Sequence, residues 1–157
     1  EIALICPALS DGDYKLVGKT KGGEDVQFYS TQGTGVEQVV TVSSKVVLWQ
    51  GHHYVSWDLP DESPNKTFNL IGANVFDQIK AGAVMSIHYS VAPEAEYHQL
   101  RTTSGWWNDL VGTSVIEFST DGVKEIQLTQ DILNQIKEQA GFLCVGHGYY
   151  VDMVTLQ

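Results

Sequence analysis

The sequence is poor in basic residues, which limits the partners that it can bind. Only 9 of its 157 residues are Lys or Arg, against 19 Asp or Glu, and the formal net charge is −10. Nucleic acids and anionic membranes are bound by basic surfaces, so we expect neither as a partner. A neutral ligand fits this composition better.

Long hydrophobic runs and a leader segment are also lacking. No apolar run approaches the roughly 20 residues of a transmembrane helix, and no charged-then-apolar segment precedes Glu1. We therefore expect an excised domain or a mature form. A chain of 157 residues can bury a core without disulfides or metals, so we predict a single domain over residues 1–157.

Cysteine is scarce, and the two cysteines fit no metal or redox spacing. Cys6 and Cys144 lie in the apolar runs ALICPAL and GFLCVG. Two interpretations remain open. We prefer buried free thiols, and the alternative is a disulfide that closes the N-terminal strand onto the C-terminal one.

Helical periodicity is confined to two short stretches. The segment ANVFDQIK predicts a short helix over about residues 73–81, ending at a glycine. Thr129 is expected to cap a second helix that ends near residue 139. Most other segments are typical of strands separated by turns, as in KVVLWQ, which Gly51 is expected to end. The sequence thus predicts an all-β fold, an antiparallel β-sandwich (jelly roll) with one or two short helices.

Residues 82–110 predict a hairpin with one apolar and one polar face. Apolar and polar residues alternate in VMSIHYSV, and Pro93 suits a tight turn. The register that keeps apolar residues together places Ile87 opposite Leu100 and His88 opposite Gln99. The polar face would then carry Ser86, His88, Ser90, Tyr97, Gln99 and Arg101.

Such a face, with tryptophan nearby, has the chemistry of a sugar site. A pyranose ring has an apolar C–H face, which a Trp ring can cover, and hydroxyls that Gln, Arg, His and Tyr can bind. Trp106 and Trp107 follow the predicted hairpin, and adjacent residues on an extended chain point to opposite sides, so one should pack inward. Trp57 and Tyr149 are further aromatic candidates, whereas Trp49 is expected in the core.

Several short motifs follow one another in an informative order: VVLWQG, a strand containing Trp57, IKAG, VMSIHYSV, GWWNDL, LTQDILNQIK and GFLCVGHGYYVDMVTL. In this order, residues 45–157 resemble the β-sandwich carbohydrate-binding modules attached to bacterial plant-cell-wall glycoside hydrolases. Residues 1–44 lie outside the resemblance. They would supply extra strands to the same sandwich or belong to a variant of the family.

The resemblance implies a function as well as a fold. Modules of this kind bind β-1,4-linked glucans (xyloglucan, mixed-linkage glucan or cello-oligosaccharides) in a cleft with aromatic platforms, and they are not enzymes. It therefore implies a secreted, extracellular, monomeric module that targets an attached hydrolase to plant cell wall. Trp107, three residues before Leu110, would be the platform, and Trp106 would be a second one if the loop is irregular. No cofactor is expected, with structural calcium as the one possible exception. Asp152 resembles a late-strand ligand of such a calcium ion, although no dense oxygen-ligand loop accompanies it.

Catalytic and zinc-binding patterns are weak. His52 and His53 are adjacent, so on a strand they face opposite ways, and no HxH or cysteine spacing supports zinc. A glycosidase needs two facing carboxylates, but Asp58, Asp61, Glu62, Glu94 and Glu96 fall in predicted loops and turns. We favour a non-catalytic binder. The alternative is a structural or adhesive sandwich that binds a protein, and a glycosidase is less favoured.

Overall fold

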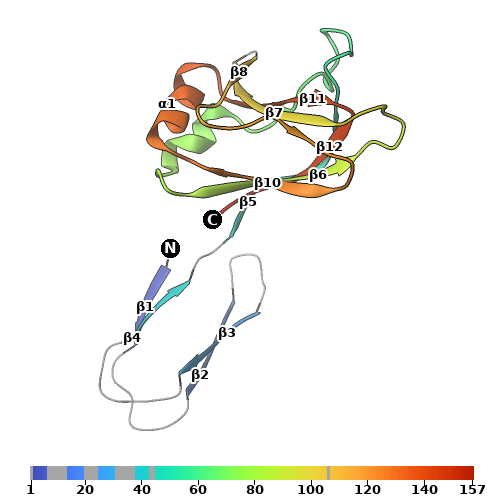
Figure 1. Ribbon diagram of the computed structural model, residues 1–157. Coiled ribbons are helices and arrows are strands. Elements are labelled where there is room, and N and C mark those ends of the chain that lie inside the picture. The colour runs from blue at the N-terminus through green and yellow to red at the C-terminus, as the bar shows by residue number, and fades with distance from the viewer. Residues whose placement is uncertain (1, 7–13, 20–24, 31–37, 43–44, 106) are drawn as a thin grey trace. The chain divides into compact units, whose positions relative to one another are not determined.

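The computed structural model describes residues 2–6, 14–19, 25–30, 38–42, 45–105 and 107–157. The chain divides into two compact units, Glu1–Ser44 and Lys45–Gln157, which Figure 1 shows in blue to cyan and in cyan to red. The boundary between the units falls where the resemblance begins, at residue 45. The single domain over residues 1–157 stays a prediction.

The first unit contains two strand pairs. β1 (Ile2–Cys6) pairs antiparallel with β4 (Gln38–Val42), and β2 (Tyr14–Lys19) pairs antiparallel with β3 (Asp25–Ser30). Each pair forms a two-stranded sheet of its own.

The second unit is a sandwich of two antiparallel sheets, which confirms the all-β prediction. One sheet, here called the β6 sheet, has the order β10-β6-β12-β5, and the other, the β7 sheet, has the order β11-β7-β8 with β9 also paired to β7. Figure 1 shows β7 and β11 in one layer and β10 and β6 in the other. The strand bounds are β5 Val46–Val55, β6 Val84–Val91, β7 Gln99–Ser104, β8 Asn108–Asp109, β9 Ile116–Glu117, β10 Gly122–Gln127, β11 Phe142–His147 and β12 Tyr149–Leu156.

The two predicted helices are present at one end of the sandwich (Figure 1). The first, η1 (Ala73–Gln78), is a 3₁₀ helix, and the second, α1 (Gln130–Glu138), is an α-helix. Thr129 caps α1 as predicted, because its hydroxyl accepts from the amide of Ile132 at 3.2 Å. None of the helices in the parts that the structure describes is long and apolar enough to cross a membrane.

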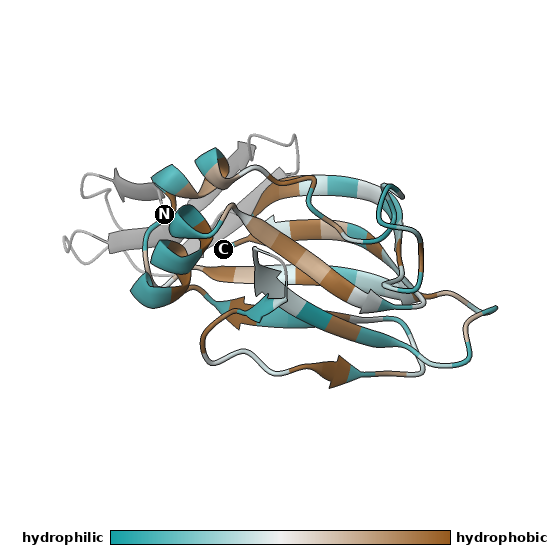
Figure 2. Ribbon diagram, turned by 90° about the horizontal axis from the view of Figure 1, so that it is seen from above, coloured by the Kyte–Doolittle hydropathy of each residue, from teal (hydrophilic) through white to brown (hydrophobic). Residues whose placement is uncertain are grey.

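The core fills the space between the two sheets. Alternation along the strands decides which side chains enter it, and Figure 2 shows hydrophobic and hydrophilic residues alternating along several strands. Met85 and Ile87 of β6 and Leu100 of β7 are fully buried. Cys144 of β11 is also fully buried, as a free thiol. This agrees with the buried free thiol that we preferred for Cys144, while the side chain of Cys6 lies outside the described part.

The structure overturns the predicted hairpin. β6 pairs with β10 and β12, whereas β7 pairs with β11, β8 and β9. A turn does follow β6, with Ala95 N donating to Ala92 O at 3.0 Å, but the chain then passes to the facing sheet. The apolar faces still meet, because the rings of Tyr89 and His98 lie 4.2 and 5.8 Å from that of Phe118. The polar faces of β6 and β7 consequently point in opposite directions.

The sequence predicted that Gly51 ends a strand. In the structure it lies within the ten-residue strand β5. A Cβ atom at Gly51 would lie 2.6 Å from two ring carbons of Trp49. The glycine therefore makes room for the indole, which packs edge-on against Phe68 with ring centroids 4.8 Å apart. This contact with the core agrees with the interior role expected for Trp49.

Candidate functional site

Four aromatic side chains gather at the outer surface of the β7 sheet. Trp57 is central, with its ring 6.2 Å from that of Tyr97, 6.2 Å from that of Trp107 and 6.1 Å from that of His147. Tyr97 stacks on His147 at 4.2 Å with an interplanar angle of 19°. Tyr97 and Trp107 are each 45% exposed. These four residues form a surface, called here the aromatic cluster, on which a flat apolar ligand can pack.

A close backbone approach holds Tyr97 in place. Gly148 has a φ of +69°, and a Cβ atom there would lie 2.4 Å from Ala95 Cβ and 2.8 Å from Tyr97 O. The amide of Ala92 also donates to Gly148 O at 3.0 Å. Only glycine lets the loop of residues 92–98 lie this close to the turn between β11 and β12.

Trp57 and Trp107 come from two further loops. Trp57 N donates to Gly146 O at 2.8 Å, which ties the residue to the end of β11. Trp107 has a φ of 67°, a left-handed conformation that costs a bulky residue about 1–2 kcal/mol. Unfavourable backbone conformations of this kind concentrate at functional sites, so the conformation of Trp107 marks this loop as a candidate.

A buried serine orients His147. Ser56 is fully buried, and its hydroxyl donates to Asp58 Oδ1 at 2.5 Å. The same oxygen lies 2.8 Å from His147 Nδ1. Because the hydroxyl proton is already donated to Asp58, the serine oxygen accepts a hydrogen bond from Nδ1–H of His147. In the neutral tautomer with its proton on Nδ1, Nε2 is then an acceptor. The ring on which Tyr97 stacks is thereby fixed.

This trio contains the residue types of a hydrolytic triad, which the sequence did not reveal, but not its arrangement. In a triad the serine is the nucleophile, and the histidine lies between the serine and the carboxylate. Here Ser56 lies between the other two, and Asp58 Oδ1 is 3.8 Å from His147 Nδ1. Ser56 is also fully buried. The arrangement therefore supports an aromatic ring and does not activate a nucleophile.

Polar side chains lie beside the aromatic cluster on the same face. His147 pairs with Gln99 and Val145 with Arg101, and cross-strand partners point to the same side of a sheet. Arg101 donates from Nε and Nη2 to the two carboxylate oxygens of Asp109, at 3.1 and 2.8 Å. This hydrogen-bonded pair raises the pKa of Arg101, and three of its five N–H donors remain for other partners.

Gln99 adds a second polar group. Its Nε2 donates to Glu117 Oε1 at 3.3 Å, which orients the amide and leaves its oxygen able to accept. The face thus offers planar donors and acceptors next to stacked rings. This is the combination that a neutral ligand with apolar faces and many hydroxyls requires.

The structure brings five of the predicted site residues together and separates others. Trp57, Tyr97, Gln99, Arg101 and Trp107 lie on or beside the outer face of the β7 sheet. Trp106 lies outside the described residues. His88 belongs to β6, in the facing sheet, so it cannot join this face.

Tyr149 is not a surface residue, contrary to prediction. It is fully buried, and its hydroxyl donates to Val145 O at 3.1 Å. Burial raises the pKa of this phenol. Position in β12 explains the error, because Tyr149 faces the core while its neighbour Tyr150 points outward.

Sequence reasoning missed residues that act through other residues. His147 stacks on Tyr97 and Asp109 accepts from Arg101, but each comes from a segment distant in sequence from the other site residues. The buried Ser56 supports the cluster through its contact with His147. No local spacing connects them. One signal was present, because the turn GHG places a histidine between two glycines, where a close approach of another loop was to be expected.

The calcium ligand predicted at Asp152 gains no support. Among the described residues, no group of three or more His, Cys, Asp or Glu side chains could hold a metal ion. Asp152 Oδ1 instead lies 2.6 Å from His52 Nδ1. Its carboxylate is thus used in a contact with a histidine.

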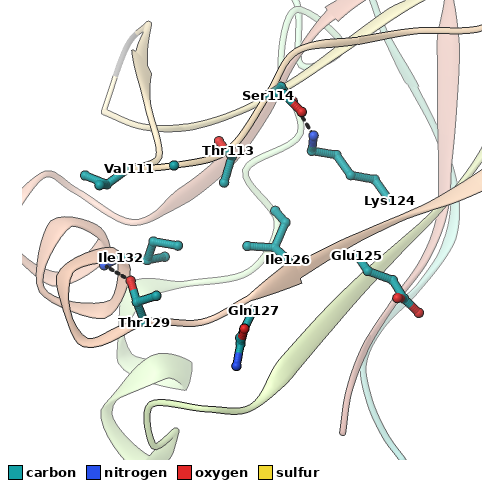
Figure 3. Close-up of a pocket in the computed structure, with 10 residues that line it drawn as sticks. Val111, Thr113, Ser114, Lys124, Glu125, Ile126, Gln127, Thr129 and Ile132 are labelled. Atoms are coloured by element: carbon teal, nitrogen blue, oxygen red, sulfur yellow. Dashed lines mark hydrogen bonds between the residues drawn. The ribbon is translucent and has the colours of Figure 1, made fainter.

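A pocket of about 310 Å³ lies elsewhere on the unit, between β10, the start of α1 and the loop after β8 (Figure 3). Lys124, which is buried, donates from Nζ to Ser114 O, and burial lowers its pKa. The described residues that line the pocket include no aromatic ring. The Lys124 ammonium group already donates to a backbone carbonyl of the protein. We therefore favour the aromatic cluster over this pocket as the functional site.

A solved structure of a glycan-bound protein is similar to this chain. No protein-family model and no curated protein matches the chain. Among solved structures, the chain is similar to SGBP-B of the Bacteroides ovatus mixed-linkage glucan utilization locus, in complex with a mixed-linkage heptasaccharide. The sequence identity is 52%, the TM-score is 0.72, and the match covers 97% of this chain. It covers 38% of SGBP-B, so the chain spans well under half of that protein.

Proposed function

We propose that the unit Lys45–Gln157 binds a β-glucan chain across the aromatic cluster and does not cleave it. The observation that carries this proposal is the cluster itself, three stacked or tilted rings around Trp57 beside Gln99 and Arg101. The 52% identity to a protein solved with a mixed-linkage heptasaccharide supports the same ligand class.

Each part of the face has a role in this proposal. Trp57, Tyr97 and Trp107 pack against the C–H faces of pyranose rings, where the apolar area removed from water supplies affinity. Gln99 and Arg101 bind vicinal hydroxyls, since a planar amide and a guanidinium fork suit adjacent oxygens. The net charge of −10 does not repel a neutral polysaccharide, so it does not weaken its binding.

The tilt of the rings favours a bent chain. The plane of Trp57 makes angles of 42° with Trp107 and 48° with Tyr97. A flat β-1,4 ribbon can lie on only one of these planes at a time, whereas a chain with β-1,3 bends can follow two. We therefore propose mixed-linkage glucan as the preferred ligand, ahead of xyloglucan and cello-oligosaccharides.

The wider role follows from the ligand. A plant β-glucan is met outside the cell, so we propose an extracellular location. Attachment to a glycoside hydrolase stays a prediction of the sequence resemblance. So does a monomeric state.

Affinity electrophoresis tests the function directly. The full chain is run in native gels that contain barley mixed-linkage glucan, xyloglucan or hydroxyethylcellulose, and we expect the strongest retardation in the first. A reducing-sugar assay on the same polysaccharides should show no product. No retardation in any gel would refute glucan binding and favour the adhesive sandwich, and released reducing sugar would refute the non-catalytic role.

A further inference from the structure

The outer face of the β6 sheet carries a second group of aromatic side chains. His52 stacks on Tyr150 with ring centroids 3.9 Å apart and an interplanar angle of 8°. Tyr54 lies beside them, 5.3 Å from Tyr150. Together with Asp152, these residues are called here the Tyr150 patch. The β6 sheet and the β7 sheet pack against each other by their inner faces. The Tyr150 patch and the aromatic cluster lie on the two outer faces, and therefore on opposite sides of the sandwich.

A β-bulge shapes this patch. The pairing of β12 shifts register between Val151 and Met153 on both of its sides, toward β5 and toward β6. Against β6, Asp152 is the extra residue, because Val151 and Met153 pair with the consecutive residues Tyr89 and His88. Against β5, the extra residue lies in β5 itself. Bulges of this kind redirect a side chain and recur next to binding sites. Here the redirected carboxylate lies 2.6 Å from His52 Nδ1, which fixes the ring parallel to Tyr150.

Polar atoms beside the patch lack partners in the described part of the chain. The outer face of β6 carries His88 and Ser90, and Ser90 pairs directly with Tyr150. His88 Nε2 and Ser90 Oγ are buried atoms without a hydrogen bond among the described residues, as is Oγ1 of Thr155, a residue that is 1% exposed. Thr155 faces Ser86 further along the same strand pair. Buried polar groups are rarely left unpaired, so these atoms indicate that a ligand or ordered water belongs here.

The three atoms follow a line along β6 and β12. Ser86, His88 and Ser90 share one face, and the four steps along the strand from Ser86 to Ser90 span about 13 Å at about 3.3 Å per residue. Stacked rings at one end and hydroxyl and imidazole groups along the line are suited to an extended neutral sugar chain.

We propose that the Tyr150 patch and the adjacent line of polar groups form a second, independent binding site for β-glucan. A pyranose ring packs on His52 and Tyr54, and the next sugars along the chain lie over the half-buried side chains of His88 and Ser90. This inference rests on the proposed function, because it assigns the same ligand class to the opposite sheet. Two sites on opposite faces let one molecule hold two polysaccharide chains, or two parts of one chain, which raises its avidity for a glucan network.

Titration with a mixed-linkage heptasaccharide tests the second site. Isothermal titration calorimetry on the full chain should give two ligands for each wild-type molecule. In Trp57→Ala/Trp107→Ala the first site is removed, and one ligand should still bind. Adding His52→Ala and Tyr150→Ala to that background should weaken the remaining binding by at least about tenfold, whereas Gln127→Ala, at the edge of the same face, should leave it unchanged.

Amide chemical shifts provide a readout that does not depend on the Tyr150 variant folding. In Trp57→Ala/Trp107→Ala, the heptasaccharide should shift the amide signals of His52, Ser90 and Tyr150. A wild-type stoichiometry of one, loss of all binding in this variant and unmoved signals would overturn the second site and leave the proposed function intact. A wild-type protein that binds no glucan overturns both proposals.

Discussion

Replacing Trp107 with glycine separates binding from stability more cleanly than any other single change. Trp107 is 45% exposed and has a φ of 67°. Glycine adopts this conformation without the steric penalty that a Cβ atom causes. Trp107→Gly therefore removes the platform and at the same time relieves about 1–2 kcal/mol of backbone cost. Affinity and stability should respond very differently.

The expected loss of affinity follows from the exposed area. A Trp side chain presents roughly 200–250 Å², so an exposed fraction of 45% leaves about 100 Å² for a sugar to cover. At about 25 cal/mol per Å² this area is worth up to about 2.5 kcal/mol, or about 60-fold in Kd. Since a sugar covers only part of the ring, we expect a loss of roughly 10- to 60-fold.

The expected loss of stability is small because two effects oppose each other. The covered half of the ring loses a similar area, about 2.5 kcal/mol, and the relief of backbone strain offsets about 1–2 kcal/mol of it. The Tm should thus fall by only a few degrees. Trp49→Ala is the matched control, since Trp49 packs on Phe68, and its loss should cost about 3 kcal/mol without changing the affinity of the folded protein.

Calorimetric titration with the heptasaccharide and thermal unfolding by circular dichroism measure both quantities on the same samples. Wild-type affinity in Trp107→Gly would show that this ring is no platform. Weakened binding in fully folded Trp49→Ala would show that the site lies elsewhere than on the β7 sheet.

Three further outcomes are expected. Gln99→Ala should weaken glucan binding by about 1–3 kcal/mol through sugar hydroxyls left unpaired, and calorimetry should show this with little change in Tm. Gly148→Ala should lower both Tm and affinity, because a Cβ atom 2.8 Å from Tyr97 O must displace that loop; an unchanged affinity would show that Tyr97 is dispensable. Burial raises the pKa of the Cys144 thiol, so above about pH 8.5 the unfolded chain loses a proton that the folded chain keeps. The free energy of unfolding should then fall as pH rises, and Cys144→Ala should flatten that slope in urea titrations.

Alternation in the sequence predicted which residues of each strand are buried, but not which strands pair. Met85, Ile87 and Leu100 are fully buried as expected. The same alternation suits a hairpin and two strands in facing sheets, since both bury one face of each strand. A turn with Pro93 fits either arrangement. Because the hairpin was chosen, His88 and Gln99 were predicted on one face. The structure places them on opposite sides of the core.

The residues of the aromatic cluster could be named from the sequence in part because they carry their chemistry on their own. Tyr97 and Trp107 are exposed and Trp57 is half-buried, all three lie in loops, and residue type alone marks them as candidates. What composition cannot supply is the distance between three loops, which depends on strand pairing and on Gly146 and Gly148 at the end of β11. The structure therefore turned separate candidates into a cluster around Trp57, and it added His147, which packs against Trp57 and Tyr97.

Supporting residues escape sequence reasoning for a different physical reason. Ser56 contributes through one hydroxyl that is shared between Asp58 and His147, and a buried serine has no pattern that separates it from an ordinary core position. Its value depends on two partners, one of them 91 positions away in the chain. The same is true of the contact between Asp152 and His52, 100 positions apart. Both pairs fix an imidazole ring on an outer face, one on each sheet, and each ring stacks on a tyrosine. The recurrence of one local arrangement on opposite faces is the reason to treat both faces as binding surfaces, and not to regard the second as solvated sheet.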